Sequence, residues 1–384
     1  MQTIVSFRKC AGYDPGLVKN TLLQLLSDLG GAEKYFKKDL KVLIKPNFLS
    51  QDKSLKGIIT HPVFTRAAAE IAIDCGSKVV IGDSAGIGSV MGILKGAGFG
   101  DYFKDLPVRI VDFNKPVETR NLQGRLYRKF LIDREVLDAE FILNLPKVKT
   151  HGQMLTSFAV KNMFGCVVGK SKPQWHLNAG NDANDFARML VELHYLIKPG
   201  LNLIDGIIGM EGNGPAAGTP VKLGFIAGSE DATALDRALC RVLCIDPGKS
   251  FTICAADSMV LGTRETDTVW KGDPQASLEI KAYRLPEVVS SAILGLPDFV
   301  QRVLKNSLTT KPLIRHDMCT LCRTCIEQCP AGAMSVADDN SVRKFVSINY
   351  HGCIRCFCCQ EICPEEAIGI KSGWILKMLN KVKT

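Results

Sequence analysis

Near its C-terminal end the chain reads Cys319-x-x-Cys322-x-x-Cys325-x-x-x-Cys329-Pro330, and the same spacing returns as Cys353-x-x-Cys356-x-x-Cys359-x-x-x-Cys363-Pro364. Zinc sites use isolated Cys-x-x-Cys pairs, and a disulfide framework requires an oxidising compartment. Neither alternative accounts for a duplicated run of four cysteines that ends in proline each time. The spacing therefore predicts bound iron–sulfur clusters.

The duplicated run resembles the cluster-binding motif of two-cluster bacterial ferredoxins. Three thiolates two residues apart converge on one cluster within a tight loop, while the fourth starts a helical turn and points towards the other cluster. The proline then fixes the direction of the chain. We therefore expect two [4Fe-4S] clusters. The first is assigned to Cys319, Cys322, Cys325 and Cys363, and the second to Cys353, Cys356, Cys359 and Cys329.

The remaining composition is that of a soluble globular protein, with 46% hydrophobic and 23% charged residues in a chain of 384. No run of 18 uncharged apolar residues predicts a transmembrane helix, and the first ten residues lack an apolar signal core. We therefore expect a cytoplasmic protein with reduced thiols. Cys358 falls outside the duplicated spacing, either as a packed thiol or as a competing cluster ligand.

The formal net charge of +9 treats every cysteine as neutral. Each oxidised cluster with four thiolates carries about −2, so the loaded protein is nearer to about +5. This modest positive balance favours an anionic ligand or an acidic redox partner protein. No dense Lys/Arg tract with interleaved aromatic residues occurs, so nucleic acid is not expected as a partner.

Residues 1–310 alternate between short apolar runs and helical patterns. The predicted strands are TIVSF (3–7), KVLIKPN (41–47), KVVIGDS (78–84), VRIVDF (108–113), EFILNLPKV (140–148), LNLIDGIIG (201–209) and LGFIAG (223–228). Predicted helices cover Leu17–Leu29, Pro62–Cys75, Asp185–Ile197 and Asp231–Leu243. This alternation predicts an α/β fold with a largely parallel sheet and flanking helices. Residues 115–135 predict a hairpin with Gly124 at its turn.

Four segments follow from the pattern. We expect an α/β domain over residues 1–282, a proline-interrupted helical linker over 283–310 and a small ferredoxin-like α+β domain over 311–371. For residues 372–384 we expect an amphipathic basic tail.

Polar residues and glycines gather where the predicted strands end. Ligands of parallel α/β sheets bind beyond the C-terminal ends of the strands, so these residues mark a candidate pocket. The candidate catalytic residues are His151, Lys149, Lys161, Asp205 and Glu211, and the candidate ligand-binding residues are Lys45, Asn47, Asp83, Ser84, Gly86, Lys147, Asn162, Gly212 and Gly214. Donors just past a buried strand favour an anionic ligand, and His151 is a candidate proton donor.

Other interpretations of these residues stay open. Residues 147–151 also fit a solvated loop, and Lys161 and Asn162 also fit an ordinary helix surface. Asp205 and Glu211 fit either proton transfer, metal binding or local capping of the loop. Met91 stands where a dinucleotide fingerprint needs its third glycine, and neither Gly165–Ser171 nor Pro247–Ser250 keeps the spacing of a phosphate loop.

Five blocks together resemble the family of domain of unknown function 362. They are KVLIKPN (41–47), GDSAG (82–86), NLPKVKTH (144–151), KNMFG (161–165) and DGIIGMEGNGPAAGTP (205–220). The resemblance covers about residues 2–310. Many members of that family carry a C-terminal two-cluster ferredoxin unit. The resemblance implies a redox role in anaerobic or facultative prokaryotes and no particular substrate.

Three functions are compatible with this combination. In the first, a reductase, the ferredoxin unit delivers electrons to an anionic substrate or cofactor in the α/β pocket. In the second, the chain is an electron carrier or docking module for a partner redox enzyme. In the third, it assembles a metal centre, and its scattered cysteines handle the metal.

Overall fold

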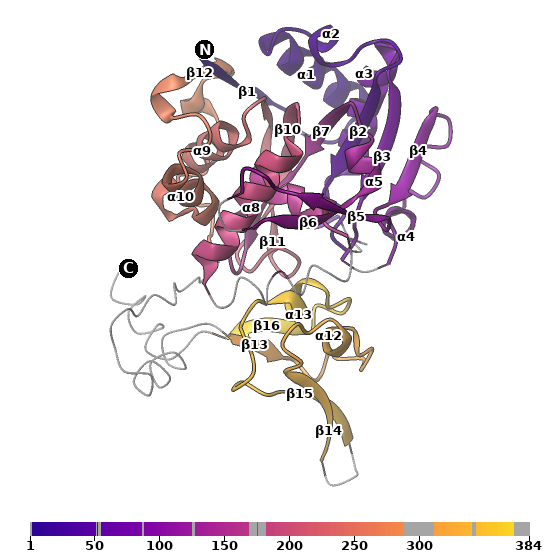
Figure 1. Ribbon diagram of the computed structural model, residues 1–384, viewed down its shortest axis with the longest axis vertical. Coiled ribbons are helices and arrows are strands. Elements are labelled where there is room, and N and C mark those ends of the chain that lie inside the picture. The colour runs from indigo at the N-terminus through magenta and orange to yellow at the C-terminus, as the bar shows by residue number, and fades with distance from the viewer. Residues whose placement is uncertain are drawn as a thin grey trace.

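The larger part of the chain is organised around one ten-stranded sheet (Figure 1). The computed structural model describes residues 2–50, 52, 55–86, 88–124, 127–168, 175, 182–286, 311–339 and 343–371. The predicted tail and all of the predicted linker beyond residue 286 lie outside these residues.

The strands of the sheet run in the order β12-β1-β11-β10-β7-β2-β3-β4, and β8 pairs with β10 and β9. Their bounds are β1 Thr3–Lys9, β2 Lys41–Pro46, β3 Lys78–Asp83, β4 Val108–Asp112, β7 Phe141–Leu145, β8 Lys147–His151, β9 Leu155–Ser157, β10 Leu201–Glu211, β11 Thr219–Ser229 and β12 Thr268–Gly272. β2, β3, β4, β7 and β10 are parallel where they pair, whereas β11 is antiparallel to both β1 and β10. The predicted fold class is confirmed, and the sheet is mixed.

Helices flank the sheet in the order α1 Pro15–Asp28, α2 Ala32–Tyr35, α3 Pro62–Asp74, α4 Val90–Gly96, α5 Arg134–Leu137, α6 Ala159–Asn162, α8 Ala183–Ile197, α9 Ala232–Val242 and α10 Phe251–Ser258. A separate hairpin joins β5 Pro116–Arg120 to β6 Lys129–Asp133, as the sequence predicts. None of the helices in the described residues is long and apolar enough to cross a membrane.

Apolar side chains of the central strands alternate between two cores. Val42 and Ile44 of β2 pack with α1 and α3 on one face, whereas Leu43 packs with α8 and α9 on the other. Successive side chains of a strand point to opposite faces, so a nearly continuous apolar run serves both cores. The sheet is therefore the middle of three layers, with helices on both of its faces. Polar residues lie at the ends of the strands.

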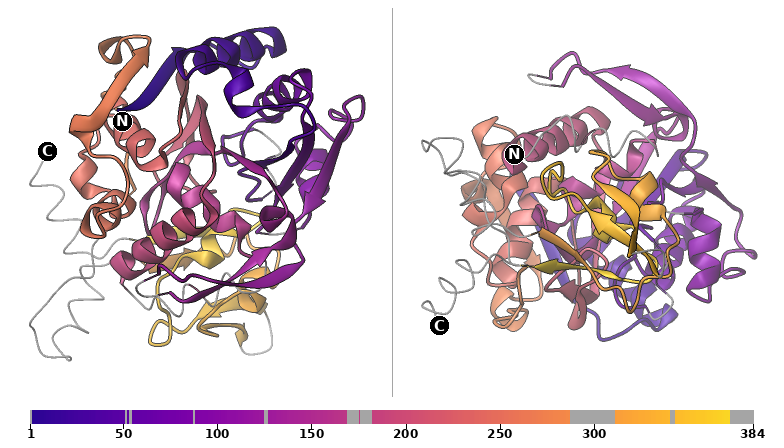
Figure 2. Two further views of the ribbon diagram at one scale, coloured as in Figure 1. Left: turned by 45° about the horizontal axis from the view of Figure 1, so that its top comes forward. Right: turned by 90° about the horizontal axis from the view of Figure 1, so that it is seen from below.

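The small C-terminal unit lies beyond one end of the strands of the sheet, on the side away from α1 and α2 (Figures 1 and 2). It contains β13 Lys311–Ile314, α12 Thr324–Glu327, β14 Met334–Asp339, β15 Arg343–Ile348, α13 Cys358–Glu361 and β16 Ile368–Lys371. β13 pairs with β16 and β14 with β15, both antiparallel. The C-terminal ends of β2 and β3 lead towards this unit, because the residues that follow them contact it.

Candidate functional site

The two cysteine motifs adopt the same backbone conformation 34 residues apart. Leu321 and Arg323 in the first motif and Arg355 and Phe357 in the second all have positive φ, between 58° and 63°. Left-handed residues between right-handed neighbours turn successive N–H groups towards one concavity, which favours bound anions such as iron–sulfur clusters. Non-glycine residues rarely adopt this conformation, so the repetition fits a cluster-binding loop in each motif.

The cysteines assigned to the first cluster line one small cavity. Cys319, Cys322, Cys325 and Cys363 surround it together with apolar neighbours such as Ile314 and Val346. The backbone N–H of Ala367 donates to Cys363 Sγ at 3.3 Å, and the N–H of Ala333 donates to Cys329 Sγ at 3.2 Å. Such hydrogen bonds to sulfur stabilise bound thiolates. This donor set fits a [4Fe-4S] cluster.

The sulfur atoms assigned to the second cluster also lie together. Burial raises the pKa of Cys359, and the neighbouring thiolates of Cys356, Cys353, Cys325 and Cys329 contribute to the rise, so Cys325 of the first set also lies nearby. In the described part of the chain, no group of three or more His, Cys, Asp or Glu residues is placed to hold a single metal ion.

A cavity of about 210 Å³ lies between the α/β unit and the ferredoxin-like unit. Residues after β2 and β3, at β9 and α6, and around α12 and α13 enclose it. Its lining comprises Lys45, Asn47, Leu49, Asp83, Ser84, Ala85, Gly86, Ser157, Lys161, Asn162, Phe164, Gly165, Gln328, Cys358, Glu361 and Ile362. Seven of the sequence-predicted site residues are among them: Lys45, Asn47, Asp83, Ser84, Gly86, Lys161 and Asn162.

A buried ion pair forms one wall of this cavity. Lys45 Nζ lies 2.8 Å from Asp83 Oδ1, and both side chains are almost fully buried. Asp83 Oδ2 accepts the N–H of Phe48, and Asp83 Oδ1 also accepts that of Ser84. A buried pair of charges is tolerated only with such additional hydrogen bonds. The polar residues after β2 and β3 are therefore bound to each other and shape the wall.

Asparagines connect this wall to the middle of the sheet. Asn47 Nδ2 donates to Asn162 Oδ1 at 2.9 Å, and Asn162 Nδ2 donates to Asn144 Oδ1 at 2.7 Å. Asn144 Nδ2 in turn donates to Asn202 Oδ1 at 2.8 Å. A buried polar network with all its members satisfied is rigid. It holds α6, which carries Lys161, against the ends of the strands.

Buried Asp236 holds the first turn of α6. Its carboxylate oxygens accept the N–H groups of Ala159 at 2.8 Å and Val160 at 3.2 Å. Burial raises the pKa of Asp236 to about 7, while these two hydrogen bonds oppose the rise. A four-residue helix has little stability of its own. The carboxylate therefore contributes to fixing the position of Lys161.

Residues 147–151 form a fully buried strand, β8, and not the solvated loop that the sequence also allowed. Lys149 Nζ donates to Asn47 Oδ1 at 2.8 Å and to the carbonyl of Ile58 at 2.7 Å. Burial, and then the charge of Lys161, lowers the pKa of Lys149 to about 7. Lys149 thus supports Asn47 from behind the cavity wall.

His151 lies at the contact between the two units. Its Nδ1 accepts the N–H groups of Gln153 and Met154, each at 3.1 Å, so the neutral ring carries its hydrogen on Nε2. Nε2 lies 2.7 Å from Glu361 Oε1 on α13. Burial, and then the charge of Lys161, lowers the pKa of His151 to about 4. At neutral pH an uncharged His151 therefore faces the Glu361 carboxylate, which lines the cavity.

Besides Lys149 and His151, five further predicted site residues lie outside the cavity lining. Lys147 Nζ and Asp205 Oδ2 form a buried ion pair at 2.7 Å, to which the Tyr13 hydroxyl is also bonded. Glu211 pairs with Arg284. The loop with Gly212 and Gly214 contacts the ferredoxin-like unit instead, since the carbonyl of Asn213 accepts Gln360 Nε2 at 3.0 Å.

Sequence reasoning did not select six residues of the lining that stand out in the structure. They are Ser157, Phe164, Gly165, Gln328, Cys358 and Glu361. Gln328 and Cys358 each precede a cysteine assigned to the second cluster. Cys358 was visible as a cysteine outside the repeat, whose counterpart in the first motif is Thr324. No signal in the sequence showed that these residues meet α6.

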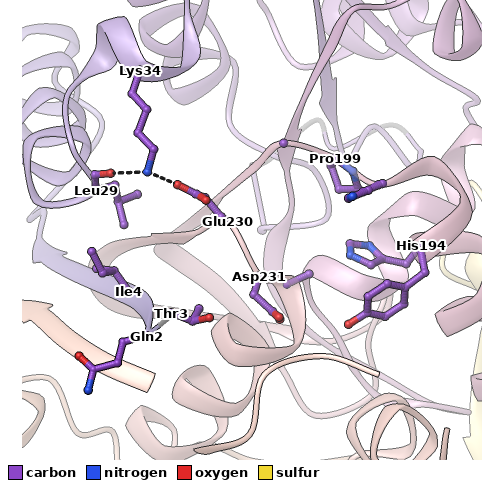
Figure 3. A pocket seen from close by; sticks show the side chains of 13 residues that line it. Gln2, Thr3, Ile4, Leu29, Lys34, His194, Pro199, Glu230 and Asp231 are labelled. Carbon is purple, nitrogen blue, oxygen red and sulfur yellow. Dashed lines mark hydrogen bonds and ion pairs between the residues drawn. The ribbon is translucent and has the colours of Figure 1, made fainter. Parts of the chain in front are cut away.

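A larger cavity of about 590 Å³ lies next to the start of β1 and the residues that join β11 to α9 (Figure 3). Lys34 and Glu230 form an ion pair there, and Lys34 also donates to the carbonyl of Leu29 at 3.2 Å. None of the sequence-predicted site residues lines this cavity. It is lined by no residue of the ferredoxin-like unit that the structure describes, so it does not lie next to the cluster-binding motifs.

Comparisons with known proteins match both parts of the chain. A family model described as "Domain of unknown function (DUF362)" matches residues 42–241, and one described as "4Fe-4S dicluster domain" matches residues 311–364. Both resemblances inferred from the sequence are thus confirmed, in the same order. The C-terminal unit is an iron–sulfur electron-carrier domain.

Two individual proteins match parts of this chain. The "Thylakoid-associated protein sll1697" of Synechocystis sp. (strain ATCC 27184 / PCC 6803 / Kazusa) is 34% identical over 302 residues, which are 79% of this chain and 94% of that protein. The structure of the lactate racemase apoprotein from Thermoanaerobacterium thermosaccharolyticum matches 62% of this chain and 56% of that chain, with 13% identity and a TM-score of 0.37.

Proposed function

This chain belongs to the family described as "Domain of unknown function (DUF362)", and we propose that it is a reductase whose ferredoxin-like unit delivers electrons to a small anionic ligand in the cavity between the two units. One observation carries the proposal. Gln328 and Cys358, each adjacent in sequence to a cysteine assigned to the second cluster, line the same cavity as Lys45 and Lys161 of the α/β unit. A ligand bound there contacts both units at once.

The electron path that we propose begins at the exposed side of the ferredoxin-like unit. Two [4Fe-4S] clusters, when bound, supply electrons one at a time. Cys322 of the first set is exposed, whereas Cys356 and Cys359 of the second set are buried. A redox partner protein therefore reaches the first set from solvent, and the second set lies nearer the cavity.

The protein groups around the cavity bind and orient the ligand. Lys161 supplies a positive charge, and the Lys45–Asp83 pair with the asparagine network keeps the wall rigid. His151 holds the Glu361 carboxylate at the cavity wall. Preorganised polar groups of this kind stabilise charge without having to rearrange during the reaction.

The test uses the full chain, loaded with clusters and reduced under anaerobic conditions. Small anionic acceptors are added one at a time, and cluster reoxidation is followed by absorbance. We expect at least one acceptor to reoxidise the wild type and Lys161→Met to slow this about 10- to 100-fold, because a charge-assisted hydrogen bond is lost. Lys104→Met, at an exposed surface position, is the control and should behave as the wild type.

Reoxidation by a partner protein alone, with no small anion effective, would replace this proposal with the electron-carrier function. Equal rates in wild type and Lys161→Met would also contradict it.

A further inference from the structure

One lysine amine in the interdomain cavity is not engaged by the protein. Lys45 Nζ is paired with Asp83 at 2.8 Å, and Lys149, behind the cavity wall, is held by two hydrogen bonds. Lys161 is half-buried and lines the cavity, and within the part of the chain that the structure describes its Nζ makes no hydrogen bond and no ion pair. This amine is therefore available to a molecule in the cavity.

The backbone that carries this amine is held in place. Asp236 accepts two N–H groups in the first turn of α6, and Asn162, the residue after Lys161, belongs to the buried asparagine network. A reactive side chain is effective only when its position is fixed relative to the reacting atoms. The surroundings of α6 supply this condition for Lys161.

The charges of the lining do not select a ligand, because it carries equal numbers of carboxylates and amines. They do affect the reactivity of the amine. Burial lowers the pKa of Lys161. The charges of Glu361 and Cys358 oppose this fall, whereas the charge of Lys45 adds to it. A desolvated lysine beside another cation is the usual setting of a nucleophilic amine.

A neutral primary amine adds to aldehydes and ketones. The nitrogen lone pair forms a bond to the carbonyl carbon, and the two amine hydrogens pass to the carbonyl oxygen. That oxygen leaves as water when the C=N double bond of the imine forms, so no electrons are gained or lost in this step. Protonation of the imine nitrogen then returns a positive charge to the position of Lys161, where the proposed function requires one.

Two further groups of the lining suit this reaction. Ser157 is 5% exposed, and its hydroxyl makes no hydrogen bond to any described residue. Buried polar groups are ordinarily hydrogen-bonded, so this hydroxyl lacks a partner that a carbonyl oxygen would supply. Glu361, which lies 2.7 Å from His151 Nε2, is a carboxylate that can carry a proton from the nitrogen to the departing oxygen.

The size of the cavity restricts the carbonyl compound. Its volume of about 210 Å³ lies below the roughly 300–1,000 Å³ typical of pockets for drug-sized ligands. The cavity is therefore suited to a molecule of only a few non-hydrogen atoms.

We propose that Lys161 is a nucleophilic amine that forms an imine with a small aldehyde or ketone in the interdomain cavity, and that Ser157 binds the carbonyl oxygen. This inference rests on the proposed function for the location of the site and adds the reactive group of the ligand. The imine holds the former carbonyl carbon in the cavity that Cys358 and Gln328 also line, beside the second set of cysteines.

Glyoxylate, a small aldehyde that is also an anion, tests the proposal together with cyanoborohydride, which reduces imines to stable amines. The full chain, loaded with oxidised clusters, is treated under anaerobic conditions at neutral pH, and peptide mass analysis quantifies carboxymethyl-lysine at each position. We expect Lys161 to be labelled at least 10-fold faster than exposed Lys104 in the same sample. The reason is that each unit by which a pKa falls raises the fraction of neutral amine about 10-fold.

Two comparisons test the cavity around the amine. Ser157→Ala should slow the labelling of Lys161 about 2- to 10-fold, and Ser335→Ala, at an exposed position, should leave it unchanged. Naphthaldehyde, which is too bulky for the cavity, should label Lys161 no faster than Lys104.

Lys161→Arg separates the imine from a purely ionic role, since arginine keeps the positive charge and is not deprotonated in proteins. In the cluster reoxidation assay it should be as slow as Lys161→Met. Equal labelling of Lys161 and Lys104 by glyoxylate would overturn the proposal, and so would preferential labelling of Lys149 or a wild-type reoxidation rate in Lys161→Arg. Fast labelling of Lys161 by naphthaldehyde would contradict the restriction to small carbonyl compounds.

The labelling experiment needs only the wild type, so it remains decisive if a variant fails to fold. It also separates this inference from the proposed function. If Lys161 is labelled while no small molecule reoxidises the clusters, the imine site stands and the reductase function fails. If small anions reoxidise the clusters while Lys161 is not labelled, the reductase function stands and the imine is excluded.

Discussion

Gly165 packs directly against the Lys45–Asp83 ion pair, and this contact leaves no room for a side chain. A Cβ atom at this position would overlap Lys45 Nζ and Asp83 Oδ1. We predict that Gly165→Ala lowers the free energy of unfolding by about 1–3 kcal/mol, because overpacking displaces a buried ion pair. Chemical denaturation followed by circular dichroism measures this.

The control is Gly12→Ala, where a Cβ atom meets nothing within 4 Å. It should be neutral or slightly stabilising, since alanine lowers the entropy of the unfolded chain. If Gly165→Ala were as stable as Gly12→Ala, the close packing around Lys45 would be disproved.

Lys149 makes stability depend on pH. Its pKa is about 7 in the folded protein, and its ordinary value is 10.5. Between these values the unfolded chain binds more protons, so the free energy of unfolding rises with pH by up to about 1.4 kcal/mol per unit from this residue. The gain is complete above about 10.5 and is lost as the pH falls to about 7.

Urea denaturation between pH 7 and pH 9.5 tests this dependence. Lys149→Met should lose the part of the rise that this residue contributes, since methionine cannot be protonated, while buried Lys147 and Lys161, whose pKa burial also lowers, keep theirs. Lys78→Met, which removes an exposed lysine, should keep it. A wild-type stability that is flat or falls across this interval, with no difference in Lys149→Met, would show that Lys149 stays charged.

At the scale of elements, apolar patterns predicted most of the larger unit. The helix starts at Pro15 and Pro62 follow from proline in the first turn and a side-chain cap before it. The pattern failed at residues 140–148, where one strand was expected. Pro146 lacks a backbone N–H, and the chain divides there into β7 and β8. The apolar pattern also does not predict the direction of a strand. β11 is antiparallel to β1 and β10, and this direction depends on pairing with residues that are distant in the sequence.

The cluster-binding loops depend on left-handed backbone conformations at four non-glycine residues. Arg323 is exposed and has φ of 63°, so its substitution tests the backbone with little effect on packing. We predict that Arg323→Val reduces bound iron and speeds its loss to a chelator, because a β-branched residue resists this conformation by roughly 1–2 kcal/mol or more.

Arg323→Gly should retain as much iron as the wild type, since glycine adopts positive φ freely. Ser335→Val places the same side chain on an exposed strand and should also retain it. Iron and labile sulfide per chain are the quantities to measure. Equal iron in Arg323→Val and Arg323→Gly would remove the backbone argument for this loop.

At the scale of the whole molecule, the sequence predicted the polar residues of the α/β unit and the cluster motifs of the ferredoxin-like unit. It did not predict that the two units contact each other. Lys45, Asn47 and Asp83 were predicted because parallel strands gather polar residues at their C-terminal ends. Asp205 and Lys147 met the same criterion, yet they neutralise each other in an internal ion pair. Contacts between segments more than 150 residues apart, such as Lys161 with the surroundings of Cys358, depend on how the two units dock. No local pattern encodes that docking.

Few polar contacts among the described residues hold the ferredoxin-like unit against the α/β unit, and the contact of His151 with Glu361 at 2.7 Å is one of them. A buried charge introduced at Gln360 should therefore release the unit. Gln360 is 1% exposed and donates from Nε2 to the carbonyl of Asn213 at 3.0 Å, while the Lys56–Glu366 pair at 3.0 Å is partly exposed and contributes little. In Gln360→Glu an ionised carboxylate faces that carbonyl without a partner. Burying an unpaired charge costs several kcal/mol, so we predict that the two units separate.

Solution X-ray scattering at pH 8 should then show a larger radius of gyration for Gln360→Glu, with iron content unchanged because the cysteines remain. The rate at which a small anionic acceptor reoxidises the clusters should fall at least 10-fold, since half of the cavity wall moves away from Lys161. Gln360→Met keeps the size of the side chain without the charge, and it should stay close to the wild type in both measurements. Gln123→Glu adds the same charge at an exposed site and should leave both unchanged. A Gln360→Glu protein that keeps its radius and its reoxidation rate would mean that apolar contacts dominate the docking.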